Sequence, residues 1–248
     1  MAKSPVNKYY FDKPEIWEEV SRNRFEEESK FLVEIFRRYG KVKNILDVGC
    51  GTGSHLNKLS KHGFVCEGID LNKNMIGFAK KQYPHIKFEV GDMKKLKYSN
   101  KFDAIICLCT TFCYNTSNED VVEALNSFYK SLRKGGLLVL ETFNSISFIE
   151  KIKFEKKIEK IDYGKFGIRS IEENSINPNK QLLIEKRTFI SSNGKRLKTD
   201  LTKYRMFFPQ EMRFFLESAG FKLLGFYGGY QTKHKNLDGF RLITVSKK

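Results

Sequence analysis

Short apolar runs alternate with helical repeats along residues 41–144. Runs of strand length lie at 45–48, 64–69, 86–90, 102–109 and 137–141. Between them, apolar residues recur three or four positions apart, as on one face of a helix, at 56–59, 75–79 and 121–132. Strands that alternate with helices are typical of parallel sheets. The pattern therefore predicts a doubly wound α/β domain with a mostly parallel sheet.

The segment before the first run has a different character. Residues 1–40 are polar and aromatic, and they place Phe25, Leu32 and Phe36 at helical spacing. This predicts one or two helices that precede the first strand.

Beyond residue 145 the pattern changes to an alternation of apolar and polar positions. The alternating segments are 166–176, 181–190 and 196–205, with turn-forming residues between them. We interpret them as three antiparallel strands inserted between the fifth strand and the last helix. A helix that begins at Phe208 and a hairpin formed by 221–230 and 240–246 are predicted to follow.

Three glycines at alternate positions, Gly49, Gly51 and Gly53, follow the first apolar run, and Asp70 ends the second. Glycine lets the backbone close on a ligand, because it has no side chain and adopts positive φ. The carboxyl ends of parallel strands meet at one edge of a sheet, where nucleotide-type cofactors bind. Asp70 could there accept hydrogen bonds from both hydroxyls of a ribose. The sequence therefore predicts a cofactor site at this edge.

The spacing of the glycines separates this loop from two common phosphate-binding motifs. The dinucleotide fingerprint is G-x-G-x-x-G, whereas this chain has G-x-G-x-G with Ser54 at the position of the third glycine. The lysine of the phosphate-binding loop is also missing. The loop is therefore predicted to bind a cofactor without phosphates.

The segment D-V-G-C-G-T-G closely resembles the first motif of the class I S-adenosylmethionine-dependent methyltransferases. L-R-K-G-G-L-L-V-L-E at 132–141 and F-P-Q-E-M-R-F-F-L-E-S-A-G-F at 208–221 also match that family. The resemblance implies a Rossmann-like sheet of seven strands and S-adenosyl-L-methionine as the cofactor. It divides the chain into N-terminal lid helices at 1–40, a methyltransferase core at 41–144 and 207–248, and a β insertion at 145–206. The insertion is expected to cover the acceptor pocket.

The same resemblance implies which residues bind the cofactor. They are Tyr10 and Arg22 of the lid, then Asp47, Gly49, Cys50, Gly51, Gly53, Asp70, Leu71, Met75, Asp92, Met93 and Leu108 of the core. Asp92 is expected to accept from the adenine amino group, and the next backbone amide to donate to a ring nitrogen. Tyr10 would lie near the methionine end, and Arg22 or Arg24 would pair with its carboxylate. Packing of the lid onto the core is the alternative for these three side chains.

Two residues at strand ends are candidates for contact with the methyl acceptor. Glu141 ends the fifth strand and Tyr114 follows the fourth. The alternative for Glu141 is a surface carboxylate that caps a backbone amide. His234 lies on a late loop between two lysines, and His55 is expected to pack or to bond the backbone. An amine acceptor needs only to lose its proton, whereas an alcohol needs a base or a metal.

Cysteine content and apolar run lengths restrict the class of protein. The five cysteines are an odd number, which favours reduced thiols and a cytoplasmic location, and Cys107, Cys109 and Cys113 do not have zinc-site spacing. No apolar run is long enough to cross a membrane. We therefore predict no metal and no membrane partner. The layout, an N-terminal lid with a β insertion, resembles the N-methyltransferases of amino sugars and of glycine, and this resemblance implies a small-molecule acceptor.

The net charge of +16 leaves two alternatives open. One is an RNA methyltransferase, although the chain has Cys109-Thr110-Thr111-Phe112 where amine methylation of nucleic acids usually shows [DN]-P-P-[YF]. The other is a non-catalytic RNA-binding protein on the same scaffold, because a fold alone does not establish activity. Lysines spread over the whole chain are typical of a solvated surface.

Overall fold

The computed structural model describes residues 9, 11–21, 24–152, 157–233 and 236–248. Tyr10, Arg22 and His234, which the sequence singled out, lie outside the described residues.

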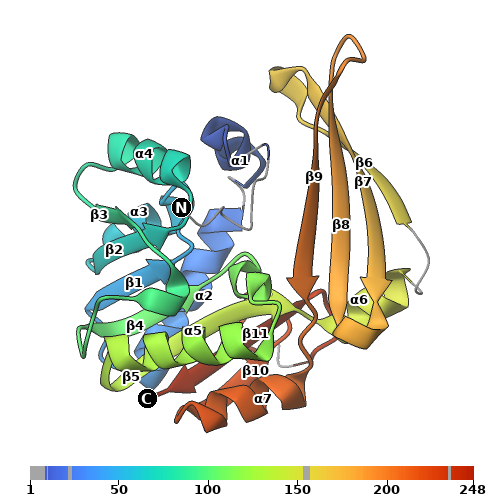
Figure 1. The fold of residues 1–248 in the computed structure, drawn as a ribbon. Coiled ribbons are helices and arrows are strands. Elements are labelled where there is room, and N and C mark those ends of the chain that lie inside the picture. Colours follow the sequence, from blue (N-terminus) through green and yellow to red (C-terminus); the bar gives the residue numbers. More distant parts are fainter. Residues whose placement is uncertain (1–8, 10, 22–23, 153–156, 234–235) are drawn as a thin grey trace.

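A central sheet of seven strands has the order β10-β11-β5-β4-β1-β2-β3 (Figure 1). The strands are β1 (Asn44–Val48), β2 (Val65–Asp70), β3 (Lys87–Val90), β4 (Phe102–Cys107), β5 (Leu132–Phe143), β10 (Lys222–Tyr227) and β11 (Arg241–Lys247). Strands β1 to β5 pair in parallel, and β11 runs antiparallel to both β5 and β10. The predicted mostly parallel seven-stranded sheet is confirmed.

Helices cover both faces of this sheet. They are α2 (Arg24–Tyr39), α3 (Ser54–Ser60) and α4 (Lys73–Gln82) on one face, with α5 (Asn118–Ser131) and α7 (Pro209–Ser218) on the other. Because neighbouring side chains of a strand point to opposite faces, Leu46 packs in the cluster under α5 and α7, while Ile45 packs under α2 and α3. Burial on both faces explains why consecutive residues of these strands, such as Ile45 and Leu46, are both apolar.

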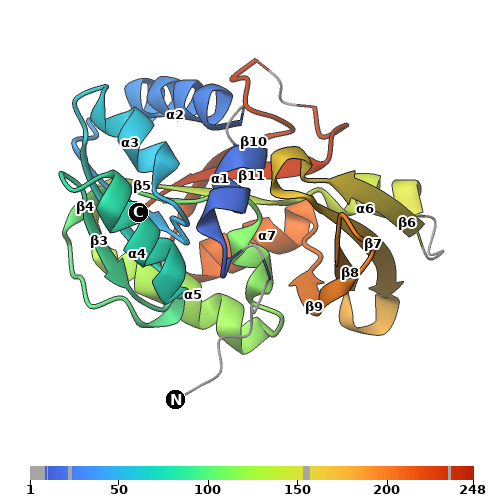
Figure 2. The same cartoon turned by 90° about the horizontal axis from the view of Figure 1, so that it is seen from above.

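A second sheet of four antiparallel strands stands beside the core (Figures 1 and 2). Its strands are β6 (Lys157–Asp162), β7 (Ile168–Asn177), β8 (Leu182–Ser191) and β9 (Arg196–Arg205). The prediction of three inserted strands was wrong by one. Ile158 and Ile161 of β6 are three residues apart, so the sequence lacks the period of two that marks a strand.

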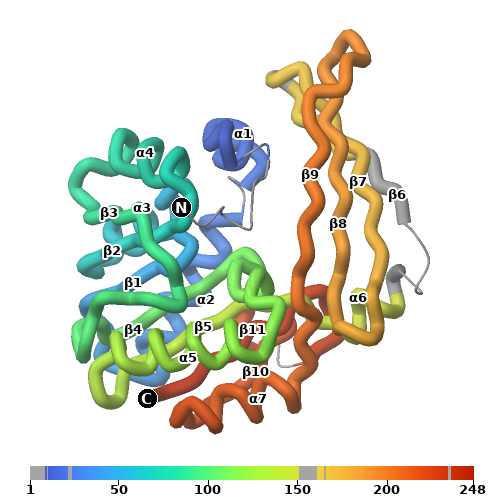
Figure 3. The backbone as a smooth tube through the Cα atoms, viewed as in Figure 1, coloured from blue at the N-terminus to red at the C-terminus, as the bar shows by residue number. Residues whose placement is uncertain are grey.

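The chain enters and leaves the inserted sheet close to the end of β5. It passes from β5 through α6 (Ser145–Ile152) into β6, and it returns from β9 to α7 (Figure 3). The sequence analysis did not predict α6. Among the described residues, no helix combines the length and the apolar character that a membrane crossing requires.

Helix α1 (Pro14–Ser21) lies between the core and the inserted sheet, as both views show (Figures 1 and 2). Ile16 packs with Tyr163, Ile168 and Phe189 of the insertion. On its other side, Glu18 accepts hydrogen bonds from the core, from Thr52 Oγ1 at 2.6 Å and from Ser54 Oγ at 2.7 Å. Helix α1 is therefore fastened to both parts of the molecule.

Candidate functional site

A cavity of about 810 Å³ lies among the described residues at the carboxyl ends of β1, β2, β4 and β5. Its walls come from α1, α2, the glycine loop after β1, the segments after β2, β3 and β4, and strands β8 and β9 of the insertion. Three parts that are distant in sequence therefore enclose one space: the N-terminal helices, the core and the inserted sheet.

The three glycines of the loop have different structural tasks, although all have positive φ. A Cβ atom on Gly49 would lie 2.3 Å from Thr111 Cγ2, and one on Gly53 would lie 2.6 Å from Phe88 Cζ. Both positions are closed by the protein itself. Among the described residues, only the Trp17 ring lies within 4 Å of the position that a Cβ on Gly51 would take, and its nearest atom is 3.5 Å away. Gly51 is therefore the glycine whose missing side chain leaves room for a ligand.

Asp70 holds the loop in place and lines the cavity. Its Oδ2 accepts a hydrogen bond from the Gly51 amide at 2.9 Å, and its Oδ1 accepts one from the Asn72 amide at 2.7 Å. Burial raises the pKa of Asp70, while these two amides oppose the shift. The carboxylate thus shapes the backbone around Gly51 from the edge of the cavity.

Most of the predicted core residues line the cavity. They are Gly49, Cys50, Gly51, Asp70, Leu71, Met75, Asp92, Met93, Tyr114 and Glu141. Asp47, Gly53 and Leu108 do not belong to its lining. The cofactor-binding role of each of these residues stays a prediction.

Asp47 is buried behind the loop. Its carboxylate is 2% exposed, and Oδ2 has no hydrogen-bond partner among the described residues. Burial raises the pKa of Asp47 from 3.8 to about 7, because ionisation without solvent is costly. The unfolded chain therefore ionises at this position at a lower pH than the folded chain.

Asp47 should make the folded state less stable as pH rises from about 4 to 7. In this window the folded state binds more protons than the unfolded state, so the free energy of unfolding falls with pH. Asp47→Asn removes the titration. We expect the variant to match the wild type near pH 4 and to exceed it by up to about 4 kcal/mol above pH 7. Urea unfolding of both proteins across this range measures the difference.

Asp103→Asn is the matched control, because the pKa of Asp103 is shifted in the opposite direction to that of Asp47. Partial burial of Asp103 is outweighed by hydrogen bonds from the Asn44 and Lys43 amides, which place its pKa below the ordinary value. Its stabilisation is present at neutral pH and is lost on acidification. A pH-independent difference between Asp47→Asn and wild type would contradict the buried titration at Asp47.

Glu141 is 2% exposed, so it is not a surface carboxylate. Its Oε2 accepts hydrogen bonds from the Cys109 amide at 2.6 Å and from the Tyr230 hydroxyl, and its Oε1 accepts from Arg241 Nε at 3.2 Å. The alternative interpretation of Glu141 is therefore right that it caps a backbone amide and wrong that it lies on the surface. Its contact with an acceptor stays a prediction.

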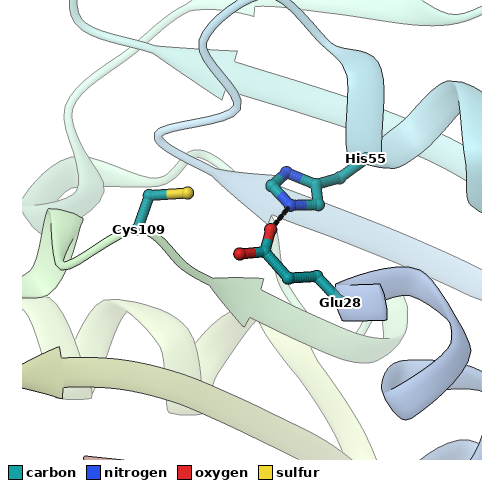
Figure 4. Close-up of side chains that lie close together, drawn as sticks. All are labelled: Glu28, His55 and Cys109. Atoms are coloured by element: carbon teal, nitrogen blue, oxygen red, sulfur yellow. Dashed lines mark hydrogen bonds and ion pairs between the residues drawn. The ribbon is translucent and has the colours of Figure 1, made fainter. Parts of the chain in front are cut away.

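A buried polar cluster that the sequence did not reveal joins α2 to α3 and to the end of β4 (Figure 4). The Glu28 carboxylate pairs with His55 Nε2 and with Arg24 Nε, the latter at 3.1 Å. Arg24 Nη2 also donates to Cys109 Sγ at 3.3 Å. His55 packs edge-on against Phe25, with ring centroids 4.8 Å apart, as expected, and it also bonds the Glu28 side chain, which was not expected.

The charges of this cluster stabilise one another. Burial opposes the ionisation of both Glu28 and His55, but their mutual attraction outweighs it. The pKa of Glu28 is therefore lowered and that of His55 raised. Arg24 contributes a guanidinium to this cluster, and Arg24 and His55 both line the cavity.

Glu28, His55 and Cys109 are also a possible set of metal ligands, since their ligand atoms lie within 4.8 Å of one another. However, the Arg24 guanidinium already donates to Glu28 and to Cys109. A divalent cation would have to displace this guanidinium. The arrangement thus fits an anchor for α2 better than a metal centre.

Comparison with known proteins identifies the family. Residues 45–136 match the model of a methyltransferase domain. The fold matches an S-adenosylmethionine-dependent methyltransferase from Clostridium acetobutylicum, with a TM-score of 0.81 and 18% identity over 97% of this chain and 99% of that one. The chain belongs to the class I S-adenosylmethionine-dependent methyltransferases. The fold is also similar to that of an amino pentose methyltransferase from Micromonospora echinaspora. The TM-score is 0.75, with 20% identity over 94% of this chain and 96% of that one.

Curated relatives of this methyltransferase include enzymes named for nitrogen methylation. It is 30% identical to dTDP-3-amino-3,4,6-trideoxy-alpha-D-glucopyranose N,N-dimethyltransferase of Streptomyces venezuelae, over 46% of this chain and 48% of that protein. It is 29% identical to glycine/sarcosine N-methyltransferase of Parasynechococcus marenigrum, over 51% of this chain and 47% of that protein. The matched part spans about half the length of these relatives.

The residues of this methyltransferase fit S-adenosylmethionine. The position of Gly51 leaves backbone open to a ligand, and the loop contains no lysine or arginine for a phosphate. Asp70 offers a carboxylate next to that backbone. The Arg24 guanidinium lines the same cavity and is suited to the carboxylate of a methionine moiety.

Proposed function

We propose that this chain transfers a methyl group from S-adenosylmethionine to a small-molecule amine. The observation that supports this most directly is the continuity of the cavity. It extends from the glycine loop and Asp70 to a wall formed by the inserted sheet. A cofactor at the loop and an acceptor at the wall would therefore share one enclosed space.

The cofactor half of the cavity supplies the groups that an adenosine and a methionine require. Gly51 and Asp70 would hold the ribose, and Asp92 the adenine. Arg24 would meet the carboxylate, the role that the sequence analysis left open between Arg22 and Arg24. Trp17 of α1 lies over Gly51 and would cover the bound cofactor.

The acceptor half is bordered by a continuous row of aromatic rings. Centroid distances along the row are 5.1 Å for Tyr114–Tyr204, 5.4 Å for Tyr204–Phe143, 5.0 Å for Phe143–Phe148 and 6.1 Å for Phe148–Phe240. These five residues all line the cavity. Tyr204 belongs to β9 of the insertion, and the other four rings lie in or next to β4, β5, α6 and β11. The row therefore forms only when the insertion packs against the core. Its faces suit an apolar body or an organic cation.

The chemistry asks little of the protein beyond alignment and the exclusion of water. When bound, the cofactor supplies an electrophilic methyl group on a positively charged sulfur. An acceptor that binds as an ammonium ion first releases one proton to a nearby carboxylate or to water. The amine lone pair then forms the new N–C bond as the C–S bond breaks. The chain's residues orient the two molecules, and α1 shields them through the hydrogen bonds of Glu18 to Thr52 and Ser54.

The charge of the cavity does not follow the charge of the whole chain. The chain has a net charge of +16, but the described lining contains five carboxylates and four lysine or arginine side chains. A cavity that bound an RNA strand would be expected to concentrate positive charge. This contrast favours a small acceptor over RNA.

Binding experiments with the purified chain test this function. Trp17 is the only tryptophan and lines the cavity, so its fluorescence should report binding of S-adenosylmethionine or S-adenosylhomocysteine. Incubation with S-adenosylmethionine and a metabolite extract should then yield a compound heavier by one CH2 group in mass spectra. Absence of cofactor binding would overturn the proposal. Salt-sensitive binding of short RNA without cofactor would favour the RNA-binding alternative.

A further inference from the structure

The face of the inserted sheet that borders the cavity is polar, although it is buried. Glu172 and Asn174 of β7 and Glu185 of β8 are 8%, 7% and 7% exposed. Glu172 lies opposite Arg187, and Asn174 lies opposite Glu185 in the strand register. Sheets usually bury their apolar face, so this polar strip requires a reason other than packing.

Glu172, Glu185 and Arg187 form one charged unit. Arg187 Nη2 lies 2.6 Å from Glu172 Oε2 and 3.1 Å from Glu185 Oε2. Burial and the nearby Glu185 raise the pKa of Glu172, which Arg187 opposes. Two carboxylates thus contact the same guanidinium. Glu185 and Arg187 line the cavity directly.

The other cations of the described lining are already matched by carboxylates. Lys94 lies 2.6 Å from Asp120, Arg241 lies 3.2 Å from Glu141, and Arg24 lies 3.1 Å from Glu28. Each of these three described cations therefore has a carboxylate partner, whereas on the insertion two carboxylates contact the guanidinium of Arg187.

We propose that Glu185 binds the methyl acceptor as an organic cation, with the ammonium group against its carboxylate and the apolar part against the rings of Phe143 and Tyr204. This inference rests on the proposed function and specifies its acceptor. Glu185 is then a specificity-determining residue, and Arg187 and Glu172 position it. The acceptor differs from the dTDP-linked sugars named for some relatives, because a diphosphate would meet the Glu185 carboxylate that lines this part of the cavity.

The charge preference can be measured with simple probes. We would saturate the protein with S-adenosylhomocysteine, so that the cofactor half is filled, and titrate three compounds of similar shape by calorimetry. They are 2-phenylethylammonium, 2-phenylethanol and phenylacetate. The cation is expected to bind at least about tenfold more tightly than the neutral alcohol, as for one charge-assisted contact. Phenylacetate is expected to bind most weakly.

Glu185→Gln identifies the carboxylate responsible. It should weaken 2-phenylethylammonium about tenfold and leave 2-phenylethanol nearly unchanged. Glu173→Gln is the control, because Glu173 is on β7 outside the cavity lining and pairs with Lys186. It should change neither affinity. If Glu185→Gln does not fold, the comparison of the three probes on the wild type still tests the inference.

Two results would overturn this inference. One is equal or tighter binding of phenylacetate than of the ammonium compound by the wild type. The other is an unchanged ammonium affinity in a folded Glu185→Gln variant. Failure of the wild type to bind S-adenosylhomocysteine would instead overturn the proposed function, so the two failures are distinguishable.

Discussion

Gly51→Val is expected to abolish the binding of S-adenosylhomocysteine while the fold is retained. The Cβ of a side chain at this position would meet only Trp17, at 3.5 Å, so the protein accommodates it. Its methyl groups would occupy the space over the loop where the cofactor has to approach. Gly51 has a φ of +53°, which adds roughly 1–2 kcal/mol of backbone strain. Fluorescence titration of Trp17 and thermal unfolding measure the two effects separately.

Gly63→Val separates steric exclusion from backbone strain. Gly63 also has positive φ, at +88°, but no described atom lies within 4 Å of the position that a Cβ would take there. It should lose a similar stability and keep full cofactor affinity. Gly49→Ala should instead destabilise the fold, because Thr111 Cγ2 would lie 2.3 Å from the new atom. Affinity of Gly51→Val within tenfold of wild type would refute the placement of the cofactor over this loop.

The sheet and the glycine loop could be predicted because their signals are local. Each strand of the core contains a short cluster of apolar residues, and the loop follows β1 directly in the sequence. Asn72 caps α4 by a similarly local contact, since its side chain accepts hydrogen bonds from the Asn74 and Met75 amides. Such patterns span a few residues, so a single sequence is enough to reveal them.

The walls of the cavity could not be predicted in the same way. The contact of Arg24 with Cys109 joins residues 85 positions apart, and that of Thr52 with Glu18 joins residues 34 apart. Neither spacing corresponds to a helix turn or to a hairpin. Glu185 belongs to an alternating strand, where a polar residue normally indicates the solvent face. Only the assembled fold shows that this face is buried against the cavity.

Helix α1 connects the glycine loop, which could be predicted, to the inserted sheet, whose position could not. It contacts the glycine loop through Glu18 and the inserted sheet through Ile16. Because the same eight-residue helix touches both walls, the position of the insertion is linked to the loop that would hold the cofactor. A short segment with contacts on both sides therefore joins the inserted sheet, which carries Tyr204 and Glu185, to the glycine loop.

Asp70→Ala is expected to weaken cofactor binding by about 1–3 kcal/mol, or roughly tenfold to a hundredfold. Two effects contribute. A bound ribose would lose its acceptor in a closed site, and the Gly51 and Asn72 amides would lose the carboxylate that orders the loop. Calorimetric titration with S-adenosylhomocysteine measures the loss directly. Asp70→Asn retains one acceptor oxygen and should fall between wild type and alanine.

Glu67→Gln provides the control for a carboxylate change on the same strand. Glu67 lies on β2 three residues before Asp70, outside the cavity lining, and pairs with Lys101 at 2.5 Å. Its substitution can alter stability but has no route to the cofactor. Equal affinity losses in Asp70→Ala and Glu67→Gln would mean that general weakening of β2 is responsible. Unchanged affinity in Asp70→Ala would remove this carboxylate from the binding site, and with it the strongest polar contact that the family resemblance assigned to the cofactor.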